Sequence, residues 1–327
     1  MGSPEGSGAD CERPRRKVDL LVGFWIMETE LTQAQWRVVA KTDPSRFKGD
    51  DRPVEQISWS DCEKFIKALD ELCPIEGDLQ FDLPTEAEWE YARRAGSTDE
   101  RYGELDEIAQ YKENSEEGTR PVAQKKPNAW GLYDMIGNVA ERTLDYWAAD
   151  YYEYGANYTP MGPDFGELLS VRGGSWGDDA DACRAAYRRG ESRTTKSDRL
   201  GVRLAPVDRA GDWVPYKRLE SAEVSFFDPS GAEPGERRVA TINGVEFPFR
   251  YCPPGALAKN SGKASEGDED DASASSSSET PEVDAGYWIA ETLLTQAQWR
   301  ALTGENESAY KGGECRSTRF LIAKSKG

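Results

Sequence analysis

Two carboxylates with a tight turn between them are the first residues whose types and spacing could do chemistry. Asp134 and Glu141 stand seven residues apart and flank the dipeptide Gly137-Asn138. Their side-chain oxygens, together with backbone carbonyls of the turn, could surround a hard cation, and calcium prefers oxygen ligands of this kind. A turn between two solvated acids has the same spacing, and spacing alone favours this second interpretation.

Sulfur and imidazole chemistry is restricted by composition. Histidine is absent from the 327 residues, which excludes His-based catalytic triads and His-ligated zinc. No phosphate-cradling glycine loop occurs.

Hydrolysis by a pair of carboxylates remains a possible chemistry, because 60 acidic residues make chance pairs abundant. The cysteines are scattered without a CxxC pair and do not form a disulfide-scaffold pattern; they are Cys11, Cys62, Cys73, Cys183, Cys252 and Cys315.

A run of arginines near residue 190 allows two interpretations. In an acidic chain these guanidinium groups could form internal ion pairs, or they could line a pocket for an acidic ligand through bidentate hydrogen bonds. The structural interpretation is favoured. The arginines are Arg184, Arg188, Arg189, Arg193, Arg199 and Arg203, and the expected partners are Asp178, Asp179, Asp181 and Asp198.

The charge balance restricts the partners. A formal net charge of −19 repels a phosphate backbone, so we expect no nucleic-acid partner. No apolar run of eighteen residues occurs, so we expect no membrane span. The first residues, MGSPEGSGAD, lack the basic region and the apolar core of a signal peptide.

Three capping boxes predict the helices that would position these residues. Thr32–Gln35 opens a helix through Val39, Ser60–Glu63 opens a second, and Thr85–Glu88 opens a third that closes at Gly96. Between residues 97 and 206, turn residues alternate with short apolar runs, which indicates short strands and ordered loops.

An internal repeat divides the chain. Residues 23–37 return as residues 286–300 with twelve of fifteen positions identical. We expect a first domain at 1–206, a linker at 207–239, an incomplete second copy at 240–313 and an unmatched tail at 314–327. Within the second copy, the Ser-rich and acidic residues 259–285 predict a disordered insert. The strand around Val245–Tyr251 has two expected fates: it is poorly folded, or it docks on an open sheet edge, for example in the first domain.

Six segments in family order resemble the formylglycine-generating enzyme, or sulfatase-modifying factor, family. They are MGSPEGSGADCERPRRKVDL, GFWIMETELTQAQW, RPVEQISWSDCEKFI, LPTEAEWEYARRAG, KPNAWGLYDMIGNVAERTLDYW and RGGSW. The resemblance implies an α+β fold similar to C-type lectins, with few helices, short antiparallel strands and much ordered loop. In that family MGS stands inside the domain. Met1 is therefore also interpretable as an internal methionine behind an upstream export signal, and the compartment stays open.

The resemblance also implies a calcium site. It transfers to the side chains of Asp134 and Glu141 and to the backbone carbonyls of Gly137 and Val139. A second calcium site of the family would begin at Asn114, but the loop that follows is shorter here, so we expect this site to be lost.

The redox residues implied by the resemblance are incomplete. Oxidases of the family use two cysteines that hold copper and bind the substrate thiol. Cys183 matches one of them and Asp178 stands at the other. Ser175 of the family site is retained, whereas Ala140 and Arg142 replace two aromatic residues. We therefore expect no copper, with Cys183 a buried apolar residue.

Three functions remain open. The favoured hypothesis is a non-catalytic member of the family that binds a small ligand or a partner protein through its loops. The second is a copper-dependent oxidase that converts a substrate cysteine of a sulfatase to formylglycine. The third is a truncated or miscalled gene product, which the broken repeat suggests.

Overall fold

The computed structural model describes residues 1–73, 79–208, 232–242, 244–257, 287–289 and 321–323. The chain forms two compact units, Met1–Lys263 and Ala264–Gly327. In the second unit, β12 (Tyr287–Ile289) pairs antiparallel with β13 (Leu321–Ala323). The predicted disordered insert at 259–285 and most of the predicted linker lie outside the described residues. The predicted domain boundaries therefore stay predictions.

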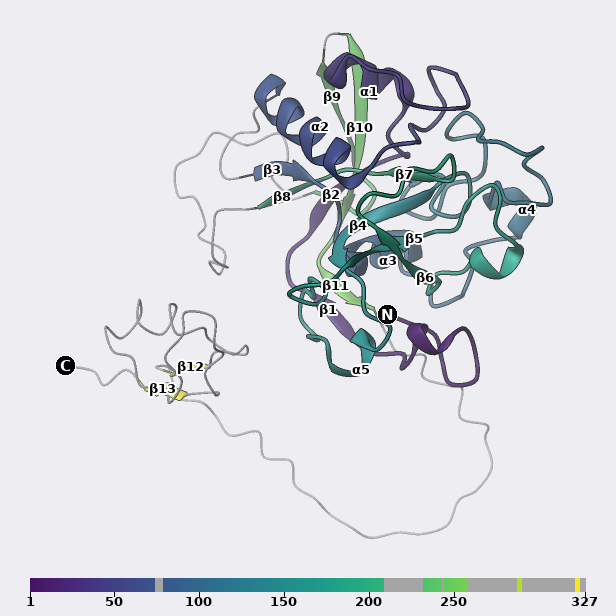
Figure 1. Cartoon of the computed structure of the whole chain (residues 1–327). Coiled ribbons are helices and arrows are strands. Elements are labelled where there is room, and N and C mark those ends of the chain that lie inside the picture. Colours follow the sequence, from purple (N-terminus) through teal and green to yellow (C-terminus); the bar gives the residue numbers. More distant parts are fainter. Residues whose placement is uncertain (74–78, 209–231, 243, 258–286, 290–320, 324–327) are drawn as a thin grey trace. The chain divides into compact units, whose positions relative to one another are not determined.

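The helices of the first unit are few and short, and α1 and α2 lie side by side (Figure 1). None of the described helices is long and apolar enough to cross a membrane. The α-helices are α1 (Gln33–Ala40), α2 (Trp59–Leu72), α3 (Glu86–Arg94), α4 (Leu105–Ile108) and α5 (Tyr151–Tyr154), and the 3-10 turns are η1 (Asp10–Glu12) and η2 (Ala180–Ala182).

Two of the three predicted capping boxes are confirmed, and one was placed wrongly. Thr32 and Thr85 cap α1 and α3, each with a reciprocal side-chain bond from the third residue of the helix. The box of α2 is formed by Ser58 and Asp61 rather than by Ser60 and Glu63. Both pairs have the same spacing, and the earlier start makes Trp59 the first residue of the helix, where its side chain is buried.

Short strands pair into four small sheets in the described part of the first unit. A mixed sheet has the order β6-β5-β4-β7, in which only β4 and β7 are parallel. The strands of the four sheets are β1 (Val18–Leu20), β2 (Phe24–Met27), β3 (Leu79–Asp82), β4 (Ala140–Tyr146), β5 (Leu168–Arg172), β6 (Arg188–Ser192), β7 (Leu200–Val202), β8 (Ala205–Asp208), β9 (Arg237–Ile242), β10 (Val245–Cys252) and β11 (Gly255–Leu257).

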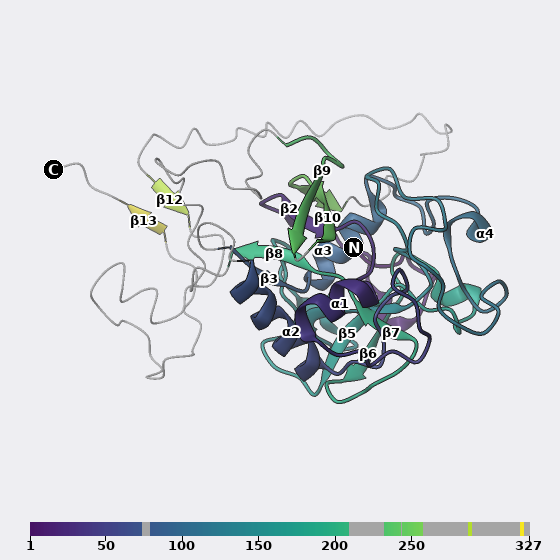
Figure 2. The ribbon, with the colours of Figure 1, turned by 90° about the horizontal axis from the view of Figure 1, so that it is seen from above.

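Strands from far along the chain complete the first unit. In the sheet β2-β10-β9, strand β10 pairs antiparallel with β2, so that Phe249 faces Met27. Strand β11 pairs antiparallel with β1. Figures 1 and 2 both place β9 and β10 beside β2. Docking of the Val245–Tyr251 strand on the first domain, one of its two expected fates, is therefore observed.

The largest buried cluster lies between this sheet, α1, α2 and the β3-β8 pair. Aromatic rings dominate it: Trp36 stacks on Phe65 with ring centroids 4.8 Å apart, and Phe81 lies 6.0 Å from Phe249. The core is thus assembled from large rings, as the ten tryptophans of the sequence suggest.

Candidate functional site

Two glycines turn the chain sharply after β5 and place the residues that follow. Gly173 and Gly174 have φ values of 91° and 69°, in the left-handed region that side chains disfavour. A Cβ on Gly173 would lie 3.1 Å from the ring of Trp89, and a Cβ on Gly174 would lie 3.0 Å from the carbonyl oxygen of Ala182. The turn therefore requires glycine at both positions and directs Ser175 inward.

Ser175 and Asp178 bond to each other. The Ser175 hydroxyl donates to Oδ2 of Asp178 at 2.7 Å, and Nη1 of Arg189 donates to the same oxygen at 3.2 Å. Ser175 is fully buried and Asp178 is partly buried. Where the family resemblance would place a second thiol, the structure holds a carboxylate engaged by a hydroxyl and a guanidinium.

Cys183 lies in an apolar setting. Its side chain is fully buried and packs in a cluster with Ile108, Tyr111 and Ile136. Burial raises the pKa of the thiol to about 12, against a smaller opposite effect of Arg101. The thiolate is the form that binds soft metals and attacks substrates, so burial disfavours the reactive form of Cys183 at neutral pH.

The two positions that lost aromatic residues are filled by structural contacts. Ala140 is fully buried against Val171 and Leu200. The buried Arg142 donates to the backbone carbonyls of Ser192 and Thr195, at 3.3 Å and 2.7 Å. Neither side chain offers a ring to a substrate.

Both oxygens of Glu141, a predicted calcium ligand, accept hydrogen bonds. Nε and Nη2 of Arg203 donate to its two oxygens at 2.8–3.2 Å, and the indole Nε1 of Trp89 donates to Oε2 at 2.7 Å. All three side chains are buried. The bidentate pair joins β4 to the segment after β7.

Asp134 and Glu30 form the rest of this acidic site. Asp134 has a φ of 54° and accepts a hydrogen bond from the backbone N–H of Ala123 at 2.6 Å. Burial raises its pKa to about 6, with a further contribution from Glu141. Burial, together with the charges of Asp134 and Glu141, also raises the pKa of Glu30.

Glu30 was missed by sequence reasoning. It accepts from Nδ2 of Asn138 at 2.6 Å and from the N–H of Val139 at 2.8 Å, so it holds the turn between Asp134 and Glu141. One sequence signal was available: Glu30 is one of the three positions that differ between the repeats, and its counterpart is Leu293.

The side chains of the two predicted calcium ligands, Asp134 and Glu141, make other contacts in this arrangement. Calcium takes six to eight oxygen ligands, but both oxygens of Glu141 are used by Arg203 and Trp89. Among the described residues, no group of three or more His, Cys, Asp or Glu side chains is arranged to hold a metal. Calcium at Asp134, Gly137, Val139 and Glu141 therefore stays a prediction. A calorimetric titration of wild type beside Asp134→Ala tests it.

The arginine run makes ion pairs, as the structural interpretation expected, but chiefly with other partners. Asp178 pairs with Arg189, whereas Asp179 pairs with Lys112, and Asp198 pairs with Arg46. Asp181 accepts from Arg184 only through its backbone carbonyl. The main partners are glutamates, in the pairs Arg184–Glu12, Arg188–Glu86 and Arg203–Glu141.

Arg172 ties α3 to the segment before β6. Its guanidinium donates to Oε2 of Glu90 at 2.6 Å and to the backbone carbonyls of Ala185, Ala186 and Tyr187. On the other side, Nε of Arg94 donates to Oε1 of Glu90 at 3.0 Å. The fully buried Glu90 thus has two cationic partners.

Because Glu90 is paired with two cations, we predict that the protein loses folding stability in acid. Burial raises the pKa of Glu90, but Arg94 and Arg172 outweigh it and lower the pKa to about 2 from 4.5. The ionised form therefore stabilises the fold above pH 4.5, and this contribution, on the order of 3 kcal/mol, is lost as the pH falls toward 2. Urea unfolding from pH 5 to pH 2 should show a steeper decline for wild type than for Glu90→Gln. Parallel declines would contradict the assignment.

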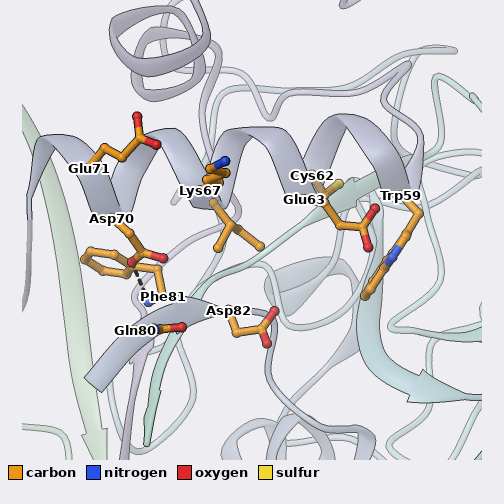
Figure 3. A pocket seen from close by; sticks show the side chains of 10 residues that line it. Trp59, Cys62, Glu63, Lys67, Asp70, Glu71, Gln80, Phe81 and Asp82 are labelled. Atoms are coloured by element: carbon orange, nitrogen blue, oxygen red, sulfur yellow. Dashed lines mark hydrogen bonds between the residues drawn. The ribbon is translucent and has the colours of Figure 1, made fainter. Parts of the chain in front are cut away.

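A separate groove of about 500 Å³ lies between α2 and β3 (Figure 3). Trp59 and Phe81 contribute rings, and Asp70 accepts from the backbone N–H of Phe81 at 2.9 Å. Glu63, also in the lining, pairs with Arg193. None of the site residues predicted from the sequence lines this groove.

Comparison with families and curated proteins gives the following relations. The model of the "Sulfatase-modifying factor enzyme 1-like domain" matches residues 1–207. "Chaperone protein LppX" of Paenibacillus barcinonensis is 29% identical over 218 residues, which are 51% of this chain and 74% of that protein. "Formylglycine-generating enzyme" of Streptomyces coelicolor is 31% identical over 202 residues, 56% of this chain and 60% of that protein. The chain thus spans less than two thirds of this enzyme.

Two solved structures share the fold. "Treponema denticola variable protein 1" is 32% identical with a TM-score of 0.53, covering 55% of this chain and 84% of that one. PvdO from Pseudomonas aeruginosa is 24% identical with a TM-score of 0.57, covering 63% of this chain and 89% of that one, and supports the fold alone. The α+β fold class predicted from the sequence is confirmed.

Proposed function

The chain belongs to the family of sulfatase-modifying factor enzyme 1-like domains, and we propose that it is a non-catalytic member that binds a partner protein. One observation carries the proposal. The position of the second thiol holds Asp178, whose carboxylate is bonded to Ser175 and Arg189, while the thiol of Cys183 is fully buried.

The chemistry of this group opposes copper-dependent oxidation. Copper(I) selects soft sulfur ligands, and a carboxylate is a hard oxygen ligand. The cation of Arg189 on Oδ2 of Asp178 further disfavours a metal ion at that oxygen. Cys183, with its raised thiol pKa, would have to supply the copper ligand and the substrate contact alone.

The alternative function is oxidation of a sulfatase cysteine to formylglycine. The sequence similarity to formylglycine-generating enzymes and the retained Ser175 and Cys183 favour it. Incubation of the full chain with a cysteine peptide of the sulfatase type, copper(I) and oxygen distinguishes the two. We expect mass spectrometry to find no formylglycine, while the Streptomyces coelicolor enzyme, run in parallel, forms it. Turnover by this chain would overturn the non-catalytic assignment.

An apolar patch supports the binding role. Six of the seven large hydrophobic side chains that are exposed in the described residues lie in two segments. A bridge between Asp19 and Tyr158 and a hydrogen bond from the N–H of Leu21 to Thr159 join these segments. Concentrated exposed apolar area is typical of protein interaction sites. The patch consists of Leu21, Val22, Tyr154, Tyr158, Met161 and Phe165.

Acidic residues accompany the patch. Asp150, Glu153, Asp164 and Glu167 are all exposed in or beside the same loop. An apolar centre rich in aromatic and methionine side chains with a charged rim is the usual composition of a protein interface. The partner that fits is therefore a protein with an apolar contact surface and basic residues around it.

Binding of the apolar dye anilinonaphthalene sulfonate measures the patch directly. We expect the wild-type chain to enhance the dye's fluorescence, because Phe165 is 85% exposed and Met161 is 62% exposed. The double variant Met161→Ser, Phe165→Ser should lose most of the enhancement. Leu72→Ser, which removes an exposed leucine outside the patch, serves as the matched control. Equal losses in the two variants would show that the patch is not a coherent surface.

A further inference from the structure

The first unit consists of two parts that meet only through non-covalent contacts and one long connection. We call residues 1–208 the receiver and residues 237–257, which hold β9, β10 and β11, the donor. The connection between the two parts, residues 209–231, runs from the end of β8 to the segment 232–236, which bonds to β10. At about 3.3 Å per extended residue, a connection of this length could span at most roughly 75 Å. The donor is therefore not tied closely to its own receiver by the chain.

The donor fills the core of the receiver. Phe247, Phe249 and Cys252 are at most 1% exposed, and Phe247 and Phe249 belong to the largest buried cluster together with residues of α1 and α2. Backbone pairing fixes the register twice: Cys252 faces Phe24 on β2, and Leu257 faces Val18 on β1. A receiver without a donor would expose this cluster and the edges of both strands.

Three receiver side chains recognise the donor by direct contact. Glu28 accepts from Nε of Arg237 at 2.5 Å and from Nη2 of Arg250 at 3.2 Å. The amide of Gln35 donates to the carbonyl of Glu246 at 2.7 Å. The ring centroids of Trp25 and Tyr251 lie 5.3 Å apart. The guanidinium carbon of Arg238 lies over the Trp25 ring, 4.6 Å from its centroid.

These three residues recur in the internal repeat. Trp25, Glu28 and Gln35 recur in the sequence as Trp288, Glu291 and Gln298. By contrast, Glu30, which bonds to Asn138 and Val139, is replaced by Leu293. Two other residues that face the donor, Phe24 and Met27, are replaced by Tyr287 and Ala290, so the repeat retains the donor contacts in part.

We propose that the receiver accepts the donor of a second copy of this chain, which gives a strand-exchanged dimer. Each donor would then make the contacts above with the other chain, in the same registers. A donor makes the same contacts with its own receiver as with the receiver of another chain. Strand exchange therefore needs no new interface, and its main free-energy cost is that of bringing two chains together. The long connection weakens the advantage of the chain's own donor, since its effective concentration falls with linker length.

Isotope mixing with a register-matched cysteine tests the proposal. Phe24→Cys would face the native Cys252 across the β2–β10 pair, and antiparallel partners lie within disulfide range. Nitrogen-15-labelled and unlabelled preparations of the full-length variant are unfolded, mixed in equal amounts, refolded and oxidised. Mass spectrometry then analyses the disulfide-linked peptides that contain positions 24 and 252. Leu21→Cys, outside the register with Cys252, is the control for random disulfides.

The two outcomes differ in isotope composition. Exchange between chains predicts linked peptides with one labelled and one unlabelled half, in a share that rises with chain concentration during refolding. Linked peptides that are always uniform would overturn the proposal. Should Phe24→Cys fail to fold, wild-type chain refolded at the same concentrations is analysed by size exclusion. There, a dimer that persists on dilution supports exchange, and monomer at every concentration contradicts it.

Discussion

Replacement of Phe249 by alanine is expected to lower the free energy of unfolding of the first unit by about 3–5 kcal/mol. The ring is fully buried in the largest cluster, 6.0 Å from Phe81, and its residue faces Met27 across β2 and β10. Its loss removes apolar contact area and leaves a cavity that the surrounding rings can fill only in part. Urea unfolding followed by tryptophan fluorescence measures the change.

A matched control lies on the neighbouring strand. Thr241 of β9 is exposed, and Thr241→Ala should change stability by no more than about 0.5 kcal/mol. A loss below 1 kcal/mol for Phe249→Ala would mean that the docked strand contributes little to the core. The first unit would then not depend on residues 237–257, and the further inference would lose its energetic basis.

Replacement of Arg172 by methionine is expected to cost about 3–5 kcal/mol. The substitution removes one of the two cationic partners of the buried Glu90 and leaves three backbone carbonyls without their donor. Each of these groups then keeps its desolvation cost without a compensating hydrogen bond. Thermal or urea unfolding at pH 7 gives the difference.

The control for charge alone is Arg37→Met. Arg37 pairs with Asp50 at the surface, with side-chain exposures of 37% and 79%, so its removal should cost at most about 1 kcal/mol. Similar losses for Arg172→Met and Arg37→Met would contradict a structural role for the RGGSW arginine.

The fold was largely predictable because its motifs are local. The boxes at Thr32 and Thr85 place two helices through hydrogen bonds within four residues of the chain. The third box was misplaced because Ser58 and Ser60 offer the same spacing, and only the burial of Trp59 separates them. Likewise, Gly96 was expected to close α3, but the helix ends at Arg94 because Ala95 already adopts a left-handed φ of 45°.

The candidate site was less predictable because its contacts are distant in sequence. The absence of a second thiol could be inferred from Asp178 alone. The bond from Arg189 to Asp178 and the insertion of Glu30 into the turn at Asn138 depend on how strands pack together. The ion-pair partners of the arginines also could not be predicted, because an arginine can pair with any of many acidic residues. The sequence did not distinguish the buried glutamates from the solvated ones.

Copper(I) binding tests the central claim, that the redox site has been lost. Full-length wild type and Cys183→Ser are titrated side by side against a chromogenic copper(I) chelator, so that the other cysteines contribute equally to both. We predict identical curves, because Cys183 is fully buried with a raised thiol pKa and Asp178 is bonded to Ser175 and Arg189. One additional tight equivalent of copper in wild type alone would contradict the account and restore the oxidase.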